Sequence, residues 1–357
     1  MTALAEAPAA GAAKLGFGAR FTAHMVLARW SAGQGWTAPE LAPHRPLELS
    51  PAAMALHYGQ AIFEGLKAYP RPDGPPALFR PGVNAERFNR SAHRLAMPEL
   101  PVELFTEACE MVVRADVAEV PTGPGQSLYL RPFMVAVEPS LGVRPAQEYL
   151  FAVIASPVDY FFADGYQAID VWCPPDQIRA APGGTGAAKC AGNYAASLSA
   201  KAQALANGCH EVLWLDAQEH RFVEELGAMN FFGVTRDASG APLLVTPGLS
   251  GTILAGNTRG SLIELAASLG IRTEQRQVEL AELTSGDGRI SEAFACGTAA
   301  SVVPIGAVTT AAGRSVIGDG LPGEVTTRLR DALAAVQYGQ SPDTFGWMHS
   351  VLPKTDA

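Results

Sequence analysis

The chain has 357 residues, of which 48% are hydrophobic and 17% are charged, and this balance is typical of a globular protein. A chain of this length is expected to form two domains, each with its own core. The formal net charge is −9 and the basic residues are not clustered, which argues against nucleic acid or an anionic membrane as the main partner. No apolar run approaches the length of a membrane span, so no membrane-spanning segment is expected.

The cysteines and the N-terminus bear on the cellular compartment. Five cysteines are scattered along the chain, odd in number and without the spacing of a metal site. They are interpreted as reduced thiols, and we expect a cytoplasmic protein without a bound metal. Residues 1–20 are rich in alanine and lack a continuous apolar segment, which predicts a flexible leader. An organelle transit peptide is the alternative.

The first domain is expected over residues 21–137. Its first part, residues 21–70, is interpreted as strands and connections that end in the segment HYGQAIFEGLKAY at 57–69. Aromatic residues mixed with glycines at this spacing suit a pocket wall, because the rings give it shape and the glycines permit close approach. Ordinary sheet packing is the alternative, and for Phe63 taken alone it is the better one.

Two helices follow in this domain. Asn84 is expected to cap the first, whose inner face holds Phe88, Ala92 and Leu95. Arg87 lies on another face of that helix, where most arginines are solvated. The second is an amphipathic helix expected over residues 102–120.

Strands are expected over residues 127–137 and 149–158, and the segment between them, 138–148, contains two prolines and a glycine. That segment is predicted to be the interdomain loop, with the C-terminal domain over residues 149–357. Tyr129 and Arg131 are two residues apart in the first strand, so they share a face. A guanidinium there is a candidate carboxylate clamp, and an edge-strand salt bridge is the alternative.

Residues 182–194, PGGTGAAKCAGNY, form a loop of small residues around Lys189 that leads into a helix. Small neighbours let the backbone approach a bound molecule, and an amine among apolar groups loses hydration, which lowers its pKa and frees it to attack carbonyls. A solvated lysine in a glycine-rich loop is the alternative. A nucleotide-phosphate loop is disfavoured, because that motif needs glycine before the lysine and Ser or Thr after it, whereas Ala188 and Cys190 stand there.

Further along, Asn193 is expected to cap a helix that stops at Gly208. Glu224 and Glu225 directly precede an apolar stretch, and one of them is expected to point inward, where a carboxylate needs a cationic partner. A solvated turn is the alternative. Residues 256–260, GNTRG, are a glycine-led turn into a helix, whose backbone amides suit an anion.

A reactive lysine, an inward acid, an anion-binding turn and a carboxylate clamp together meet the needs of pyridoxal-5'-phosphate chemistry. These features occur within the motifs HYGQAIFEGLKAY at 57–69, NAERFNRSAHRLAMP at 84–98, LYLRPF at 128–133, KCAGNY at 189–194, EELGAMN at 224–230, GNTR at 256–259 and CGTAA at 296–300. On these motifs the sequence resembles the branched-chain amino-acid aminotransferases, which are fold-type IV (D-amino-acid-aminotransferase-like) pyridoxal-phosphate enzymes. The resemblance covers about residues 21–348, nearly the whole chain.

The resemblance implies a two-domain α/β (α+β) fold of the fold-type IV kind and pyridoxal 5'-phosphate as cofactor. Lys189 corresponds to the lysine that forms the Schiff base and moves the proton. Glu225, rather than Glu224, corresponds to the acid at the pyridine nitrogen, and Tyr194 to the tyrosine at the ring oxygen. The implied phosphate groups are the guanidinium of Arg87, the amides of Asn257 and Thr258, and the hydroxyl of Thr298.

The resemblance also implies how substrates bind. The groups implied for the substrate carboxylate are Tyr129, Arg131, Thr298 and the amide of Ala299. Those implied for the side-chain pocket are Tyr58, Phe63, Gly65 and Tyr160. A mainly apolar pocket with Arg131 at its edge would accept an aliphatic side chain and also a second carboxylate. The implied reaction is ping-pong transfer of the amino group between L-leucine, L-isoleucine or L-valine and 2-oxoglutarate, which yields glutamate and 2-oxo acids, in a homodimer.

The sequence departs from the family pattern at three places. Ala191 replaces a usual glycine, and Asn257 stands where an aliphatic residue is common. Ala300 and Val303 replace the Cys-x-x-Cys of vertebrate members, so no thiol switch is expected there. The same fold leaves a D-amino-acid aminotransferase or an aminodeoxychorismate lyase as alternatives. A catalytically silent binding protein is a further one, although Lys189 and Glu225 are both present.

Overall fold

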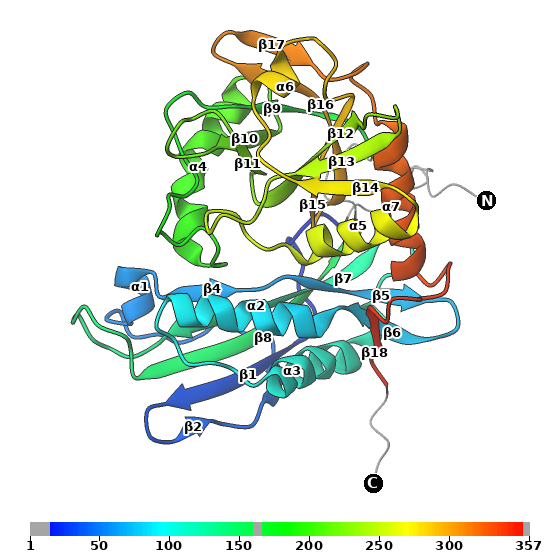
Figure 1. Cartoon of the computed structure of the whole chain (residues 1–357). Helices are drawn as coiled ribbons and strands as arrows, with labels where there is room; N and C mark the ends of the chain where they lie inside the picture. The colour runs from blue at the N-terminus through cyan, green and yellow to red at the C-terminus, as the bar shows by residue number, and fades with distance from the viewer. Residues whose placement is uncertain (1–14, 160–165, 353–357) are drawn as a thin grey trace. The chain divides into compact units, whose positions relative to one another are not determined.

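The computed structural model describes residues 15–159 and 166–352. The chain forms two compact units, each with a nine-stranded sheet (Figure 1). The first unit comprises residues 1–163, 188–191 and 335–357, and the second comprises residues 164–187 and 192–334. Two units of mixed helix and sheet confirm the predicted α/β (α+β) class. No helix in the described part of the chain has the length and apolarity needed to cross a membrane.

The first unit is built on an antiparallel sheet with the strand order β18-β6-β5-β7-β8-β1-β2, in which β3 pairs with β1 and β4 with β7. Its strands are β1 (His24–Ser31), β2 (Gly35–Trp36), β3 (Glu40–Pro43), β4 (Ala61–Phe63), β5 (Leu66–Arg71), β6 (Gly74–Phe79), β7 (Ser127–Ala136), β8 (Glu148–Val158) and β18 (Met348–Ser350). Its helices are α1 (Met54–Tyr58), α2 (Pro81–Arg94), α3 (Val102–Ala115) and the 3-10 turn η1 (Val117–Glu119).

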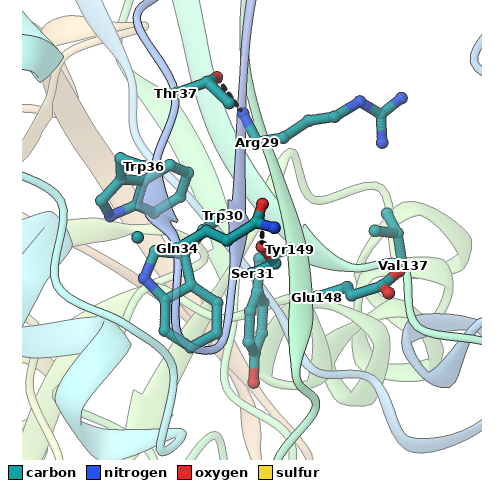
Figure 2. Close-up of a pocket in the computed structure, with 10 residues that line it drawn as sticks. Arg29, Trp30, Ser31, Gln34, Trp36, Thr37, Val137, Glu148 and Tyr149 are labelled. Atoms are coloured by element: carbon teal, nitrogen blue, oxygen red, sulfur yellow. Dashed lines mark hydrogen bonds between the residues drawn. The ribbon is translucent and has the colours of Figure 1, made fainter.

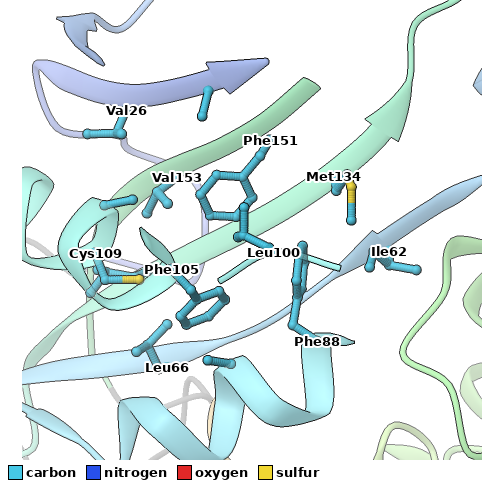
Figure 3. Packing of buried hydrophobic residues seen from close by; sticks show 14 of the residues in the cluster. Val26, Ile62, Leu66, Phe88, Leu100, Phe105, Cys109, Met134, Phe151 and Val153 are labelled. Carbon is cyan, nitrogen blue, oxygen red and sulfur yellow. The ribbon is translucent and has the colours of Figure 1, made fainter. Parts of the chain in front are cut away.

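Helices α2 and α3 cover one face of this sheet and enclose the core. Phe88 of α2, Phe105 of α3 and Phe151 of β8 lie with ring centroids 5.5 to 6.1 Å apart (Figure 3). Leu128 and Leu130 of β7 belong to the same core cluster. Because side chains alternate along a strand, the residues between and after these leucines point to the opposite face, away from the helices.

The boundary expected at residues 138–148 differs from the observed division. Strands β7 and β8, on either side of that segment, pair along their whole length, from Ser127↔Val158 to Ala136↔Tyr149. The prolines and glycine therefore mark the connection of a hairpin within the first unit. Turn-forming residues look alike in a hairpin loop and in a domain linker, because both need the chain to leave regular structure.

The second unit has a mixed sheet with the order β11-β10-β9-β16-β15-β12-β13-β14, and β17 pairs with β16. Strand β9 is parallel to β10 and β16, and β13 is parallel to β14. The strands are β9 (Ile169–Trp172), β10 (Glu211–Leu215), β11 (Val223–Leu226), β12 (Met229–Arg236), β13 (Pro242–Thr246), β14 (Arg272–Gln275), β15 (Glu292–Gly297), β16 (Ser301–Thr310) and β17 (Gly313–Val316). The remaining helices are α4 (Ala191–Ala206), α5 (Asn257–Ser268), α6 (Ala281–Thr284) and α7 (Glu324–Gln337).

Both asparagines predicted as helix caps lie inside their helices instead. Helix α2 begins at Pro81, whose fixed φ suits a first turn, so Asn84 is an interior residue. Helix α4 begins at Ala191, and the Asn193 side chain holds Thr185 through two hydrogen bonds of 2.6 and 2.8 Å. Gly208 follows α4 with a φ of +70°, which confirms the left-handed stop.

Candidate active site

Lys189 is held in the first unit by its backbone. Its N–H donates to Ser91 Oγ of α2 at 2.8 Å, and its carbonyl accepts the N–H of Phe63 at 3.0 Å. Cys190 continues this contact as a β-bridge to Ile62. The Lys189 ammonium lies 4.8 Å from the centroid of the Phe63 ring. A lysine loop tied to a helix and a strand presents its side chain in a defined direction.

The polar side of α2 faces this lysine segment. Asn84, Arg87 and Ser91 are three and four residues apart, so they share one face of the helix, and all three are buried. Asn84 and Arg87 contact Glu64, while Ser91 contacts Lys189. The helix thus connects the predicted phosphate arginine to the predicted catalytic lysine.

Glu64 is a buried acid to which sequence reasoning gave no role. Arg87 donates to it twice, from Nε at 2.7 Å and from Nη2 at 2.8 Å. Burial raises the pKa of this carboxyl, but the charge and hydrogen bonds of Arg87, with Lys189 and Asn84, outweigh burial and bring the pKa below its usual value. The available signal was a charged residue inside the apolar stretch Ala-Ile-Phe-Glu-Gly-Leu.

Tyr129 and Arg131, the two residues predicted to bind a carboxylate, lie together on the opposite face of the sheet. Arg131 Nη2 donates to the Tyr129 hydroxyl at 3.0 Å, and its guanidinium lies 4.7 Å from the centroid of the Phe63 ring. Arg131 Nε is buried without a hydrogen-bond partner among residues 15–159 and 166–352. Lys67 pairs with Tyr129 across the strands and is buried, which lowers its pKa to about 8. This sheet face therefore offers cations to an anionic ligand.

Gly65 leaves no room for a side chain beside Tyr129. A Cβ built on it would meet the Tyr129 hydroxyl and lie 2.9 Å from Tyr129 Cζ, so any side chain must displace the ring. This contact accounts for glycine at a position that the sequence assigned to the pocket.

Replacing Gly65 with alanine should lower kcat/KM for an amino-acid substrate by roughly ten- to a hundredfold, because overpacking of this size costs about 1–3 kcal/mol and moves the Tyr129–Arg131 pair. Steady-state kinetics with L-leucine measures the effect. Gly82→Ala in α2, where a new Cβ meets nothing within 4 Å, is the matched control. Equal kinetics for the two variants would contradict this role of Gly65.

The other two pocket residues are not joined to this group. Tyr58 is 42% exposed, and its hydroxyl donates to the carbonyl of Leu141. Tyr160 lies outside the described residues. The structure therefore brings Phe63, Gly65, Tyr129 and Arg131 together, and it leaves the pocket roles of Tyr58 and Tyr160 as predictions.

Glu225 lies in β11 of the second unit, and two hydrogen-bond donors and one ion-pair partner surround its carboxylate. These are the N–H of Leu254 at 2.5 Å, Nδ2 of Asn230 at 3.3 Å and the guanidinium of Arg179, whose Nε is 3.1 Å away. Arg179 also donates to the carbonyls of Gly186 and Thr252. Sequence reasoning missed Arg179, because nothing in its local sequence links it to an acid 46 residues later.

Glu224 is buried as well, so both acids point inward rather than one. Its contacts differ from those of Glu225: it accepts a hydrogen bond from Thr252 Oγ1. Burial raises the pKa of Glu224, and the hydrogen bond from Thr252 and the charge of Arg179 only partly offset this. The neighbouring acids are thus placed in different surroundings, as alternation along a strand requires.

The glycine-led turn opens α5 as predicted. Gly256 is the N-cap and has no side chain to bond the first-turn amides, and Asn257 and Thr258 are both buried there. Arg259 follows, buried, with Nη2 donating to Pro247 O and Gln275 Oε1, both at 2.9 Å. Its Nε has no partner among the described residues. A helix N-terminus beside a buried guanidinium suits an anionic group such as a phosphate.

The remaining predicted residues also lie in the second unit. Tyr194 is in the first turn of α4, and Thr298 and Ala299 are in the turn between β15 and β16. All three are half-buried. The donors present therefore fit pyridoxal 5'-phosphate chemically: an amine, guanidinium groups and a helix start for a phosphate, and a carboxylate for a pyridinium.

A cavity of about 420 Å³ lies elsewhere in the first unit, beside β1, β2 and the start of β8 (Figure 2). Trp30, Trp36 and Tyr149 line it together with Arg29 and Glu148. None of the predicted site residues lines this cavity.

Comparison with known proteins identifies the family of this chain. The model of the family described as amino-transferase class IV matches residues 61–308. A probable branched-chain-amino-acid aminotransferase of Streptomyces coelicolor is 51% identical over 94% of this chain and 92% of its own length. The branched-chain-amino-acid aminotransferase of Mycolicibacterium smegmatis is 49% identical over 93% of this chain and 91% of its own length. The chain belongs to the branched-chain aminotransferases of class IV.

Solved structures of class IV aminotransferases have the same fold. The Escherichia coli branched-chain amino acid aminotransferase is 28% identical, with a TM-score of 0.74 over 91% of this chain and 99% of that one. The branched-chain enzyme of T.th., solved in complex with N-(5'-phosphopyridoxyl)-L-glutamate, is 29% identical, with a TM-score of 0.72 over 91% of this chain and 98% of that one. Enzymes of this family depend on pyridoxal 5'-phosphate, and this chain has the matching donors.

Proposed function

We propose that the protein is a branched-chain-amino-acid aminotransferase that moves the amino group reversibly between L-leucine, L-isoleucine or L-valine and 2-oxoglutarate. The observation that carries this proposal is the attachment of Lys189 to β4 and α2, in the same unit as the Tyr129–Arg131 clamp. A carbonyl-reactive amine and a carboxylate clamp are the two groups that an amino-acid substrate needs. The high identity to branched-chain enzymes supports the substrate class.

In this proposal pyridoxal 5'-phosphate, when bound, supplies the aldehyde and the electron-withdrawing ring. The Lys189 amine would hold the cofactor covalently and, once the substrate's amino group has displaced it, would be free to take a proton from the substrate Cα and return it. The Glu225 carboxylate would hold the proton at the pyridine nitrogen, and Tyr194 would donate to the ring oxygen. The groups that would bind the phosphate are Arg87, the amides at Asn257 and Thr258, and Thr298.

The substrate groups have to accept two kinds of side chain. Tyr129, Arg131, Thr298 and the amide of Ala299 bind carboxylate oxygens, with Arg131 as the fork that fits them. Phe63 and Gly65, with Tyr58 and Tyr160, leave an apolar space for leucine, isoleucine or valine. The distal carboxylate of glutamate or 2-oxoglutarate would reach Arg131, which explains how one site serves both half-reactions.

The protein is further proposed to act as a homodimer in the cytoplasm, with small molecules as its only substrates. Exposed apolar side chains of the first unit support the dimer: Leu56 in α1 is 61% exposed, and Leu141 and Val143 in the β7–β8 connection are 66% and 85% exposed. Five buried cysteines without a disulfide suit a reducing compartment. Light scattering on the purified protein would give the oligomeric state.

The absorption spectrum of the purified protein tests the proposal. With pyridoxal 5'-phosphate, we expect a visible band that L-leucine converts to the pyridoxamine form and that 2-oxoglutarate restores. A band that ignores L-leucine and responds to a D-amino acid would move the function to a D-amino-acid aminotransferase. No band after reconstitution would contradict the enzymatic proposal and favour a silent binding protein.

A further inference from the structure

The Glu64 carboxylate accepts hydrogen bonds from Arg87, Asn84 and Gly65. Its side chain has no exposed surface. Oε1 accepts from Arg87 Nε at 2.7 Å, and Oε2 accepts from Arg87 Nη2 at 2.8 Å, Asn84 Nδ2 at 2.7 Å and the N–H of Gly65 at 3.1 Å. A two-point pair of this kind fixes the plane of the guanidinium as well as its distance.

A buried ion pair adds little to the stability of the fold, so its presence here indicates another role. Removing two charges from water carries a desolvation penalty, and well-packed apolar residues in the same place are often equally stable. The arginine in this pair is the residue proposed to bind the cofactor phosphate. Its neighbour Gly65 contacts Tyr129 of the substrate clamp. Glu64 therefore contacts both Arg87, proposed to bind the cofactor, and Gly65, which lies beside the proposed substrate residue Tyr129.

Glu64 also interacts electrostatically with Lys189. Burial raises the pKa of Glu64, but Arg87 and, to a smaller extent, the charge of Lys189 lower it by more. Ser91, one turn after Arg87 on the same helix, fixes the backbone of Lys189.

We propose that Glu64 is a positioning residue of the cofactor site, which orients the Arg87 guanidinium for the phosphate. This inference rests on the proposed function. The effect is geometric and acts through Arg87, whose guanidinium plane the Glu64 carboxylate fixes by two hydrogen bonds.

The test is Glu64→Gln, which keeps the shape of the side chain and removes its charge. We expect the dissociation constant of pyridoxamine 5'-phosphate, measured by titrating the apoenzyme, to rise roughly ten- to a hundredfold, because charge-assisted hydrogen bonds are lost. We also expect the affinity for pyridoxamine, which lacks the phosphate, to change much less. A merely structural role would weaken the binding of both compounds alike.

Glu110→Gln is the matched control. Glu110 is also paired with an arginine in the first unit, Arg114 at 2.6 Å, and with His349 at 2.5 Å, but it lies on the surface of α3. The same change from acid to amide there should not alter the affinity for either compound.

The outcomes are separable. Wild-type affinity for pyridoxamine 5'-phosphate in Glu64→Gln would overturn the inference, and so would an equal loss of affinity for pyridoxamine, since that is the pattern of a structural defect. Where Glu64→Gln does not fold, Glu64→Asp decides: it keeps the charge with a shorter reach, so weaker binding supports the inference and unchanged binding overturns it. A wild-type protein that forms no visible band contradicts the proposed function instead.

Discussion

Lys189→Ala is expected to lose at least about a thousandfold in the rate of transamination, because the variant lacks both the covalent attachment point of the cofactor and the base at the substrate Cα. The backbone of Lys189 carries the contacts to Phe63 and Ser91, and the substitution leaves them in place. The fold should therefore persist while the chemistry fails. Single-turnover absorbance changes with L-leucine measure the loss.

Two further measurements make this prediction specific to the amine. A small amine such as methylamine, added to Lys189→Ala, should restore part of the rate because it can move the same proton. Lys201→Ala, which removes a partly exposed lysine bound to Glu211 at 2.8 Å, should keep wild-type turnover. A Lys189→Ala protein as active as Lys201→Ala would refute the assignment.

The sequence was most informative where the candidate functional residues and the pattern that predicts their secondary structure lie in one short segment. The lysine loop, the clamp strand β7 and the turn before α5 were all identified correctly in sequence, because a period of two or a glycine before a helix is visible locally. The role of each residue came from the resemblance to a family, not from these patterns. The positions of Tyr129 and Arg131 on one face show what local periodicity can establish.

What the sequence left out depends on contacts between distant segments. Glu64, in the connection between β4 and β5, forms an ion pair with Arg87 of α2. Arg179 forms an ion pair with Glu225 of β11, which is distant from it in sequence. Asn84 was interpreted as a cap because asparagine favours that place, but its side chain finds Glu64 and Gly65 as partners instead. The preference of asparagine for helix caps takes no account of tertiary contacts. Here the hydrogen bond to the buried Glu64 is the contact that the Asn84 side chain makes instead.

Glu225→Gln should lower kcat by roughly a hundred- to a thousandfold, the usual cost of removing one preorganised electrostatic group. Asn230 and the Leu254 amide donate to this carboxylate and the Arg179 guanidinium forms an ion pair with it, an arrangement that suits an acid facing a pyridinium. Glu224→Gln provides the control from the adjacent residue. Burial raises the pKa of Glu224, and its hydrogen bond goes to Thr252, so its amide variant should remain near wild type.

The comparison of the two amide variants decides which acid serves the cofactor. Both changes are isosteric, lie in the same strand and remove the same formal charge, so a general loss of stability would affect them alike. Only a direct role at the pyridine nitrogen predicts a loss in one and not in the other, seen in kcat at saturating L-leucine and 2-oxoglutarate. A larger loss in Glu224→Gln would exchange the roles of the two residues, and it would leave the Arg179–Glu225 pair as a structural contact of β11.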